Sequence, residues 1–181
     1  MEIEKNDVYS DMVSILNKGI NGVSSDKIFL NEGKEHANVV LSKIFESANT
    51  KVNMLTGCMD DNVLLTDSFK KSLNSFLMKD NSELNIIFVQ DITLDKDKCQ
   101  LIGLTENFKS KVNLYKFKGN VSHDSQNCHF TTADDKMFRF EYDIKDFKAK
   151  CSFNRPEQVT YLNEKFEEIK VSSERVQINV G

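Results

Sequence analysis

Apolar residues alternate between helical spacing and short unbroken runs over positions 26–118, and this alternation restricts the fold more than any other sequence feature. The run Leu84-Asn85-Ile86-Ile87-Phe88-Val89 has the length and composition of a central strand that is buried on both faces. The segments 37–48 and 69–77 instead place apolar residues three or four positions apart, as a helix requires. Strands that alternate with helices of ordinary length predict an α/β/α sandwich with a mixed, largely parallel sheet.

The same patterns predict the remaining elements. Strands are expected over 28–30, 52–55 and 112–117, and helices over 8–20 and 97–108. In the last third, strands 128–132 and 137–142 form a C-terminal β-hairpin across Ala133-Asp134-Asp135-Lys136, followed by a strand over 148–153 and a closing helix over 159–169. We expect one domain over 1–181, with a helical extension over 1–22 and a tail over 171–181 whose alternating apolar residues suit an extra strand.

Composition narrows the class of protein. Hydrophobic residues make up 39% of the 181 positions, which is typical of a globular chain. No apolar run approaches the length that spans a bilayer, and the first residues lack the apolar core of a signal peptide. The 4 cysteines lie far apart without a C-x-x-C pair, so free thiols in a reducing compartment are the simplest prediction. We therefore expect a cytoplasmic protein with no membrane partner.

The charge balance disfavours nucleic acid as a partner. Lys and Arg number 24 against 28 acidic residues, which gives a net charge of −4. Because nucleic-acid binding depends on cations that neutralise phosphates, such a role would need a local basic patch. The best candidates are Lys109, Lys111, Lys116 and Lys118, although lysines also protect the exposed edges of sheets.

The segment Cys128–Asn163 contains the clearest chemical pattern. His129 lies on a predicted strand, an acidic turn follows, and Ser152 and Asn154 lie just before the closing helix. This order resembles the active-site half of the phospholipase D-like phosphodiesterases, whose pattern is H-x-K-x4-D followed by G-S-x-N. Three positions depart from it: Thr131 occupies the lysine position, Lys136 the aspartate position and Cys151 the glycine position.

The resemblance implies a phospholipase D-like fold and a specific chemistry that needs no metal or cofactor. In that family one histidine attacks phosphorus, and a second histidine, from another copy of the motif, protonates the leaving group. His129 would be the nucleophile, and Ser152 and Asn154 would hold the phosphate. Without the lysine, about 3 kcal/mol or more of transition-state stabilisation is lost, unless Lys136 or Arg139 supplies the cation.

Two functions of different classes follow. The first is a degenerate, non-catalytic domain that binds a protein partner, a second copy of itself or a phosphate ligand. The second is a homodimeric phosphodiesterase or nuclease in which each subunit contributes His129. Structural roles compete with both: His129 as a core or interface histidine, Asn154 as a helix N-cap, and Arg139 as the partner of Glu141 in an ion pair. A zinc site of His123, Cys128 and His129 matches no standard spacing, so no metal is expected.

Overall fold

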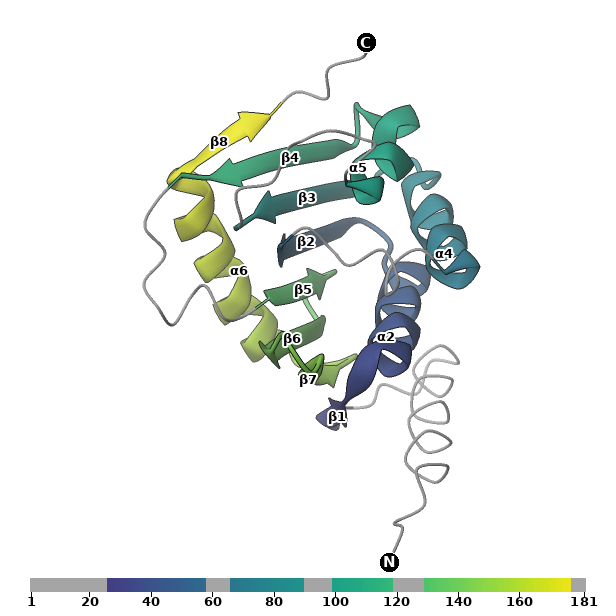
Figure 1. The fold of residues 1–181 in the computed structure, drawn as a ribbon, viewed down its shortest axis with the longest axis vertical. Coiled ribbons are helices and arrows are strands. Elements are labelled where there is room, and N and C mark those ends of the chain that lie inside the picture. The colour runs from purple at the N-terminus through teal and green to yellow at the C-terminus, as the bar shows by residue number, and fades with distance from the viewer. Residues whose placement is uncertain (1–25, 58–65, 90–98, 119–128, 177–181) are drawn as a thin grey trace, which may run out of the picture.

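One mixed sheet between two layers of helices forms the fold (Figure 1). The computed structural model describes residues 26–57, 66–89, 99–118 and 129–176. Within these residues the sheet has eight strands in the order β1-β7-β6-β5-β2-β3-β4-β8. The strands are β1 (Phe29–Asn31), β2 (Lys51–Thr56), β3 (Glu83–Phe88), β4 (Val112–Phe117), β5 (His129–Ala133), β6 (Met137–Asp143), β7 (Lys148–Ser152) and β8 (Ser173–Val176).

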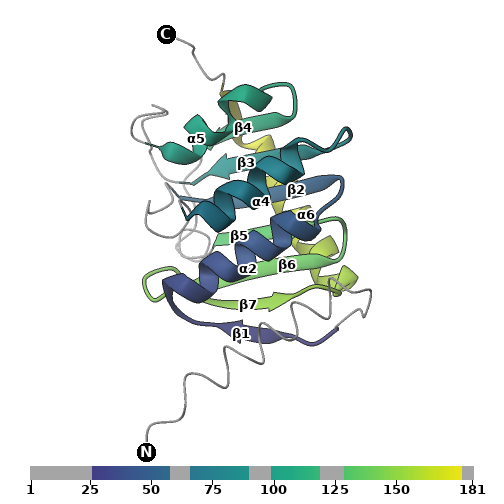
Figure 2. The ribbon, with the colours of Figure 1, turned by 90° about the vertical axis from the view of Figure 1, so that its right-hand side faces the viewer.

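Helices cover both faces of the sheet, as a sandwich requires. Helices α2 (Gly33–Ser47), α4 (Asp67–Leu77) and α5 (Gln100–Thr105) lie on one face, with a 3-10 turn (Glu106–Phe108) after α5. Helix α6 (Pro156–Val171) crosses the opposite face, on the left of Figure 1. Figure 2 looks onto the face that α2 and α4 cover. Among the described residues, no helix has both the length and the apolar character needed to cross a bilayer.

The structure confirms the mixed α/β sandwich, the hairpin and the closing helix. Its parallel part is smaller than predicted: β2, β3 and β4 run parallel, and every other pairing is antiparallel. For β5–β6 and β6–β7 the cause is that these strands follow one another through short turns, which allow only antiparallel neighbours. The predicted strand in the tail is found as β8, while the predicted helix over 8–20 lies outside the described residues.

Each face of the sheet has its own core. Between the sheet and α2 and α4, Phe45 makes edge-on contacts with the rings of Phe69 and Phe76. Under α6, Phe166 lies edge-on to Phe130 of β5, at a ring separation of 6.5 Å.

The acidic turn between β5 and β6 has a structural role. Asp134 and Asp135 have φ values of 47° and 56°, so they form the two central residues of a type I′ turn. The Asp134 carboxylate accepts hydrogen bonds from the backbone N–H groups of Thr50 and Lys51, at 2.9 and 3.1 Å. Burial alone would raise the pKa of Asp134, but these backbone hydrogen bonds outweigh burial and lower it.

We predict that Asp134→Gly lowers the free energy of unfolding by about 1–2 kcal/mol, because glycine keeps the turn but removes charge-assisted hydrogen bonds. Asp135→Gly is the matched control and should be neutral or stabilising, since it changes the same turn without those bonds. Because the pKa of Asp134 is lowered on folding, its contribution is present at neutral pH and is lost as the pH falls through the folded-state pKa. Denaturant unfolding of both variants measures the difference, and equal effects would contradict it.

Candidate functional site

His129 lies where the parallel strands end. It is the first residue of β5, which runs antiparallel to β2, so it reaches the edge at which β2 ends and Gly57 follows. In open α/β sheets, ligands bind at this edge, outside the carboxyl ends of the strands. The position of His129 therefore suits a ligand site.

A chain of polar contacts connects His129 to the core. Glu141 lies directly opposite His129 on β6, with its Oε2 at 3.3 Å from His129 Nδ1. The other carboxylate oxygen of Glu141 accepts a hydrogen bond from Arg139 Nη2 at 2.7 Å. Arg139 Nε donates to Asn31 Oδ1 of β1 at 2.8 Å. The side chains of His129, Glu141 and Arg139 are only 14%, 7% and 5% exposed.

The hydrogen bonds of His129 fix its tautomer. The backbone N–H of Gly57 donates to His129 Nε2 at 3.0 Å, and a backbone amide can only donate. Nε2 must therefore be unprotonated, and Nδ1 must carry the proton that faces Glu141. Both ring nitrogens are engaged within the protein, and the nitrogen left free for nucleophilic attack in this tautomer is the one that Gly57 occupies.

The surrounding charges are balanced. Burial alone would raise the pKa of Glu141, but the hydrogen bond from His129 and the charge of Arg139 lower it, so Glu141 is ionised beside Arg139. The thiol of Cys151 lies 3.9 Å from Asn31 Oδ1, and burial raises its pKa to about 12. A thiol with that pKa stays protonated at neutral pH, so Cys151 acts as a small core residue.

Arg139 is a cation next to Thr131, which occupies the position of the lysine in the phospholipase D-like pattern. Thr131 and Arg139 lie directly opposite each other on β5 and β6, and both side chains lie on the α2 side of the sheet. The predicted intra-sheet pair of Arg139 with Glu141 is confirmed. Asp143 contacts Lys148 instead, because the pairing register of β6 and β7 shifts between Glu141 and Asp143. The charge of Arg139 is thus already matched by Glu141.

The structure does not bring the other predicted site residues to His129. Ser152 lies opposite Phe138, which packs under α6, so its side chain is on the opposite face of the sheet from His129. The Ser152 hydroxyl accepts a hydrogen bond from the backbone N–H of Asn154 at 3.3 Å. Lys136 is exposed in the hairpin turn, at the far end of β5 from His129. His129 and Arg139 form one cluster, while Ser152, Asn154 and Lys136 lie elsewhere.

The prediction that Asn154 caps the closing helix is wrong. Helix α6 begins at Pro156, and Arg155 is its N-cap, without a side-chain hydrogen bond to the first turn. Proline fixes φ at the first helical position and restricts the residue before it, so the N-cap moves one position along the chain from Asn154. Arg155 is instead held by its own contacts, with Nε donating to the Asp26 carbonyl.

Two of the four lysines that could form a basic patch have structural contacts. Lys111 Nζ donates to the carbonyls of Leu77 and Lys79 at the end of α4, at 2.9 and 2.7 Å. Lys118 pairs with Glu174 across the strands β4 and β8. For the zinc alternative, His123 and Cys128 lie outside the described residues, and no three metal-ligating side chains gather in the part of the chain that is described.

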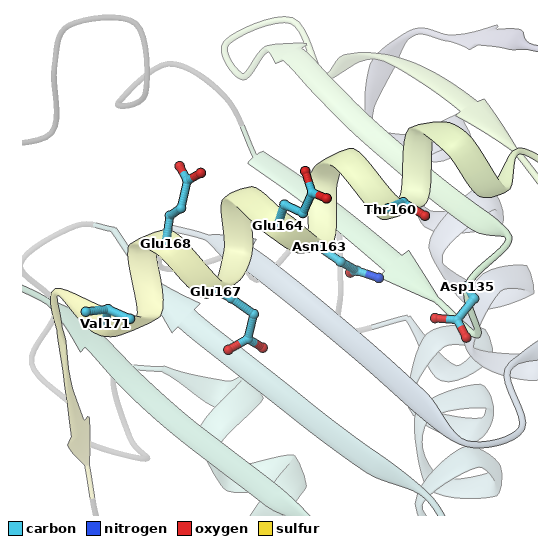
Figure 3. A pocket seen from close by; sticks show the side chains of 7 residues that line it. All are labelled: Asp135, Thr160, Asn163, Glu164, Glu167, Glu168 and Val171. Carbon is cyan, nitrogen blue, oxygen red and sulfur yellow. The ribbon is translucent and has the colours of Figure 1, made fainter.

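An open groove of about 690 Å³ runs along α6, on the side of the hairpin turn (Figure 3). Among the described residues that line it, none is basic, and the polar ones are Asp135, Thr160, Asn163, Glu164, Glu167 and Glu168. Two of its carboxylates are partly neutralised, because Lys170 pairs with Glu167 and Lys165 with Glu168. An acidic lining repels phosphates, so this groove does not suit a nucleic acid.

A ladder of asparagines crosses the sheet beneath α6 and was not foreseen from the sequence. Asn113 donates to Asn85 at 2.9 Å, Asn85 to Asn53 at 3.0 Å, and Asn53 to Asn163 of α6 at 3.0 Å. Arg175 starts the series by donating to Asn113 Oδ1 at 2.7 Å. The sequence does contain a signal for it, because each of the three parallel strands places one asparagine between two apolar residues near its start (52–54, 84–86 and 112–114).

Solved structures share this fold at low sequence identity. The phospholipase D family member Nuc from Salmonella typhimurium has a TM-score of 0.60 and 12% identity, covering 84% of this chain and 99% of Nuc. NucT from Helicobacter pylori has a TM-score of 0.60 and 14% identity, covering 83% of this chain and 99% of NucT. The archaeal chromatin protein TrmBL2, whose structure shows a mode of DNA binding, has a TM-score of 0.60 and 10% identity; the match covers 94% of this chain but 63% of TrmBL2.

These likenesses show that the chain has a phospholipase D-like fold. No curated protein matches its sequence. A family model does match residues 33–177, which include every described helix and all strands but β1. The chain therefore belongs to the family described as a domain of unknown function, DUF7931.

Proposed function

We propose that this chain is a degenerate phospholipase D-like domain that acts by binding and does not hydrolyse phosphodiesters. The hydrogen bond from the Gly57 N–H to His129 Nε2 is the main support, because it occupies the lone pair that would attack phosphorus. A nucleophile that is already hydrogen-bonded to the backbone must break that contact before it can react, which adds to the barrier.

The electrostatics around His129 support the same conclusion. Hydrolysis would need positive charge near the phosphate, and Thr131 cannot supply it. Among the described residues the nearby cation is Arg139, which is buried and bound to Glu141 and Asn31. A phosphate at this position would meet a cation whose charge a neighbouring carboxylate already balances, so its binding would be weak.

One contact supports the alternative, a homodimeric phosphodiesterase or nuclease that uses His129 from each subunit. Glu141 holds the Nδ1 side of the imidazole, and a carboxylate in that position orients a catalytic histidine and stabilises its protonated form. Rotation of the Gly57 peptide would then release Nε2. Both candidates therefore give His129 a defined role, and they differ in whether the chain turns over substrate.

We predict that the purified protein, assayed without metal on bis-p-nitrophenyl phosphate and on DNA, gives the same background rate as His129→Ala. The reason is that, among the described residues, the Nε2 lone pair of His129 is occupied by the Gly57 N–H and the charge of Arg139 is matched by Glu141. His36→Ala is the matched control, because it removes a half-buried histidine of α2. Wild-type turnover that His129→Ala and His129→Asn abolish, and that His36→Ala retains, would establish the phosphodiesterase instead.

The ligand class that fits the described surface is protein. The groove along α6 is acidic, two of the lysines that could form a basic patch are engaged in internal contacts, and the net charge is −4. Each of these features weakens attraction to phosphates. A second copy of the chain or another protein therefore remains as the binding partner, as the sequence pattern also predicts.

A further inference from the structure

The peptide group between Thr56 and Gly57 connects three strands at the carboxyl edge of the sheet. Its N–H donates to His129 Nε2 of β5 at 3.0 Å, and its carbonyl accepts a hydrogen bond from the backbone N–H of Val89, just after β3, at 2.9 Å. Because both groups belong to one rigid plane, the peptide cannot turn without disturbing both bonds. The contact with His129 therefore also helps to hold the ends of β2 and β3 together.

The contact between Gly57 and His129 requires a neutral imidazole. A backbone N–H can only donate, so Nε2 must offer a lone pair. Protonation of His129 places a hydrogen on Nε2, and two donors then face each other. Imidazole is the side chain whose ordinary charge change falls between about pH 5 and about pH 8. The contact is therefore tied to the protonation state of one side chain.

Glu141 decides which side of this contact moves. It lies opposite His129, with its Oε2 at 3.3 Å from Nδ1, so a positively charged imidazole gains an ion pair there. The ring is also enclosed, since only 14% of the His129 side chain is exposed. Gly57 has no side chain to pack, and glycine adopts backbone angles that other residues avoid. The peptide at Gly57, and not the ring, is therefore the part that can turn.

Few charged groups lie near His129 among the described residues. Glu141 contacts the ring, and Arg139 balances the charge of Glu141 from its other oxygen. The remaining titratable and charged side chains at this end of the sheet lie in the first turn of α2 and in the turn between β6 and β7: Lys34, Glu35, His36, Asp143, Asp146 and Lys148. Lys148 pairs with both aspartates of that group. His36 changes its charge by the same chemistry as His129, so a test must separate the two.

We infer that His129 is a pH-sensitive switch. While its imidazole is neutral, it holds the peptide between Thr56 and Gly57; once protonated, it releases that peptide and loosens the ends of β2 and β3. Those ends lie at the edge where open α/β sheets bind ligands, so the switch sets the shape of the surface that a partner meets there. A protonated Nε2 has no lone pair, so the released form is no better a nucleophile. The inference goes beyond the proposed function, because it concerns regulation and holds whether or not the chain is catalytic.

The test follows the backbone amides of the wild-type protein by NMR spectroscopy between about pH 8 and about pH 5. We expect the amide resonances of Gly57 and Val89 to shift with the same midpoint as the ring resonances of His129. A scalar coupling across the N–H···N hydrogen bond should join the Gly57 nitrogen to His129 Nε2 at high pH and should be lost at low pH. A Gly57 amide that does not follow the ring would overturn the inference, and so would a coupling that survives protonation of the ring.

Two variants identify the histidine that is responsible. His129→Gln keeps an acceptor for the Gly57 N–H close to the position of Nε2 but does not titrate, so the pH-dependent shifts of Gly57 and Val89 should disappear. His36→Gln removes the histidine of α2 and should leave both shifts unchanged. Shifts that persist in His129→Gln, or that vanish in His36→Gln, would assign the effect to another group and refute the switch. Because none of these measurements involves hydrolysis, failure here is distinguishable from failure of the non-catalytic role.

Discussion

Replacing Arg139 by methionine is expected to lower the free energy of unfolding by about 3–5 kcal/mol, because it leaves the buried carboxylate of Glu141 without its cation. The same substitution removes the hydrogen bond that Arg139 Nε donates to the Oδ1 atom of Asn31. Without Arg139, burial dominates and the pKa of Glu141 rises, so the carboxyl becomes neutral more readily. The deficit relative to wild type should therefore shrink as the pH falls. Denaturant unfolding followed by circular dichroism at neutral and mildly acidic pH measures both effects.

The double variant Arg139→Met, Glu141→Leu separates the cost of an unpaired charge from the cost of lost packing. Removing both charges leaves no buried ion, so we expect the double variant to be more stable than Arg139→Met alone. It also removes the carboxylate that faces Nδ1 of His129, so the His129 ring resonances should shift in NMR spectra. If the double variant is as unstable as the single one, the cluster contributes packing and not charge balance.

The fold was largely predictable because it rests on local patterns. Alternating strands and helices, the hairpin and the closing helix are all encoded by apolar spacing and by turn residues. The direction of the outer strands was not predictable in the same way. The spacing of apolar residues within a strand does not show which other strand pairs with it, or whether the two run parallel or antiparallel. The sequence did predict the antiparallel pair of β5 and β6, because the two adjacent acidic residues Asp134 and Asp135 suit the tip of a hairpin.

The site was predictable in part. The sequence identified His129 and the pairing of Arg139 with Glu141, because alternation along one strand places residues two apart on the same face. It did not predict the face of Ser152, because that face depends on the pairing register of β7 with β6. The contact from the Gly57 N–H to His129 joins residues that are 72 positions apart, and no local pattern encodes it. That contact decides the proposed function.

The asparagine ladder supports the second large prediction. Asn85 is 1% exposed, and it both donates to Asn53 and accepts from Asn113. Asn85→Ala would leave one buried acceptor and one half-buried donor unsatisfied, at a cost of about 2–4 kcal/mol in the free energy of unfolding. Asn74→Ala is the matched control, because Asn74 is exposed on α4 and alanine favours the helix. Thermal or denaturant unfolding of both variants measures the difference.

A double-mutant cycle tests whether the ladder acts as a unit. Once Asn85 is replaced, Asn53 has already lost its donor, so Asn53→Ala should cost less than it does in the wild type, with a coupling of about 1–2 kcal/mol. Additive effects would show that the asparagines are independent buried residues. Coupling would indicate that the ladder helps to fix the pairing register of the sheet. A slip of one residue between β2 and β3 would move Asn85 to the apolar face under α2 and α4. The register of the three parallel strands would then be specified by one amide side chain on each strand.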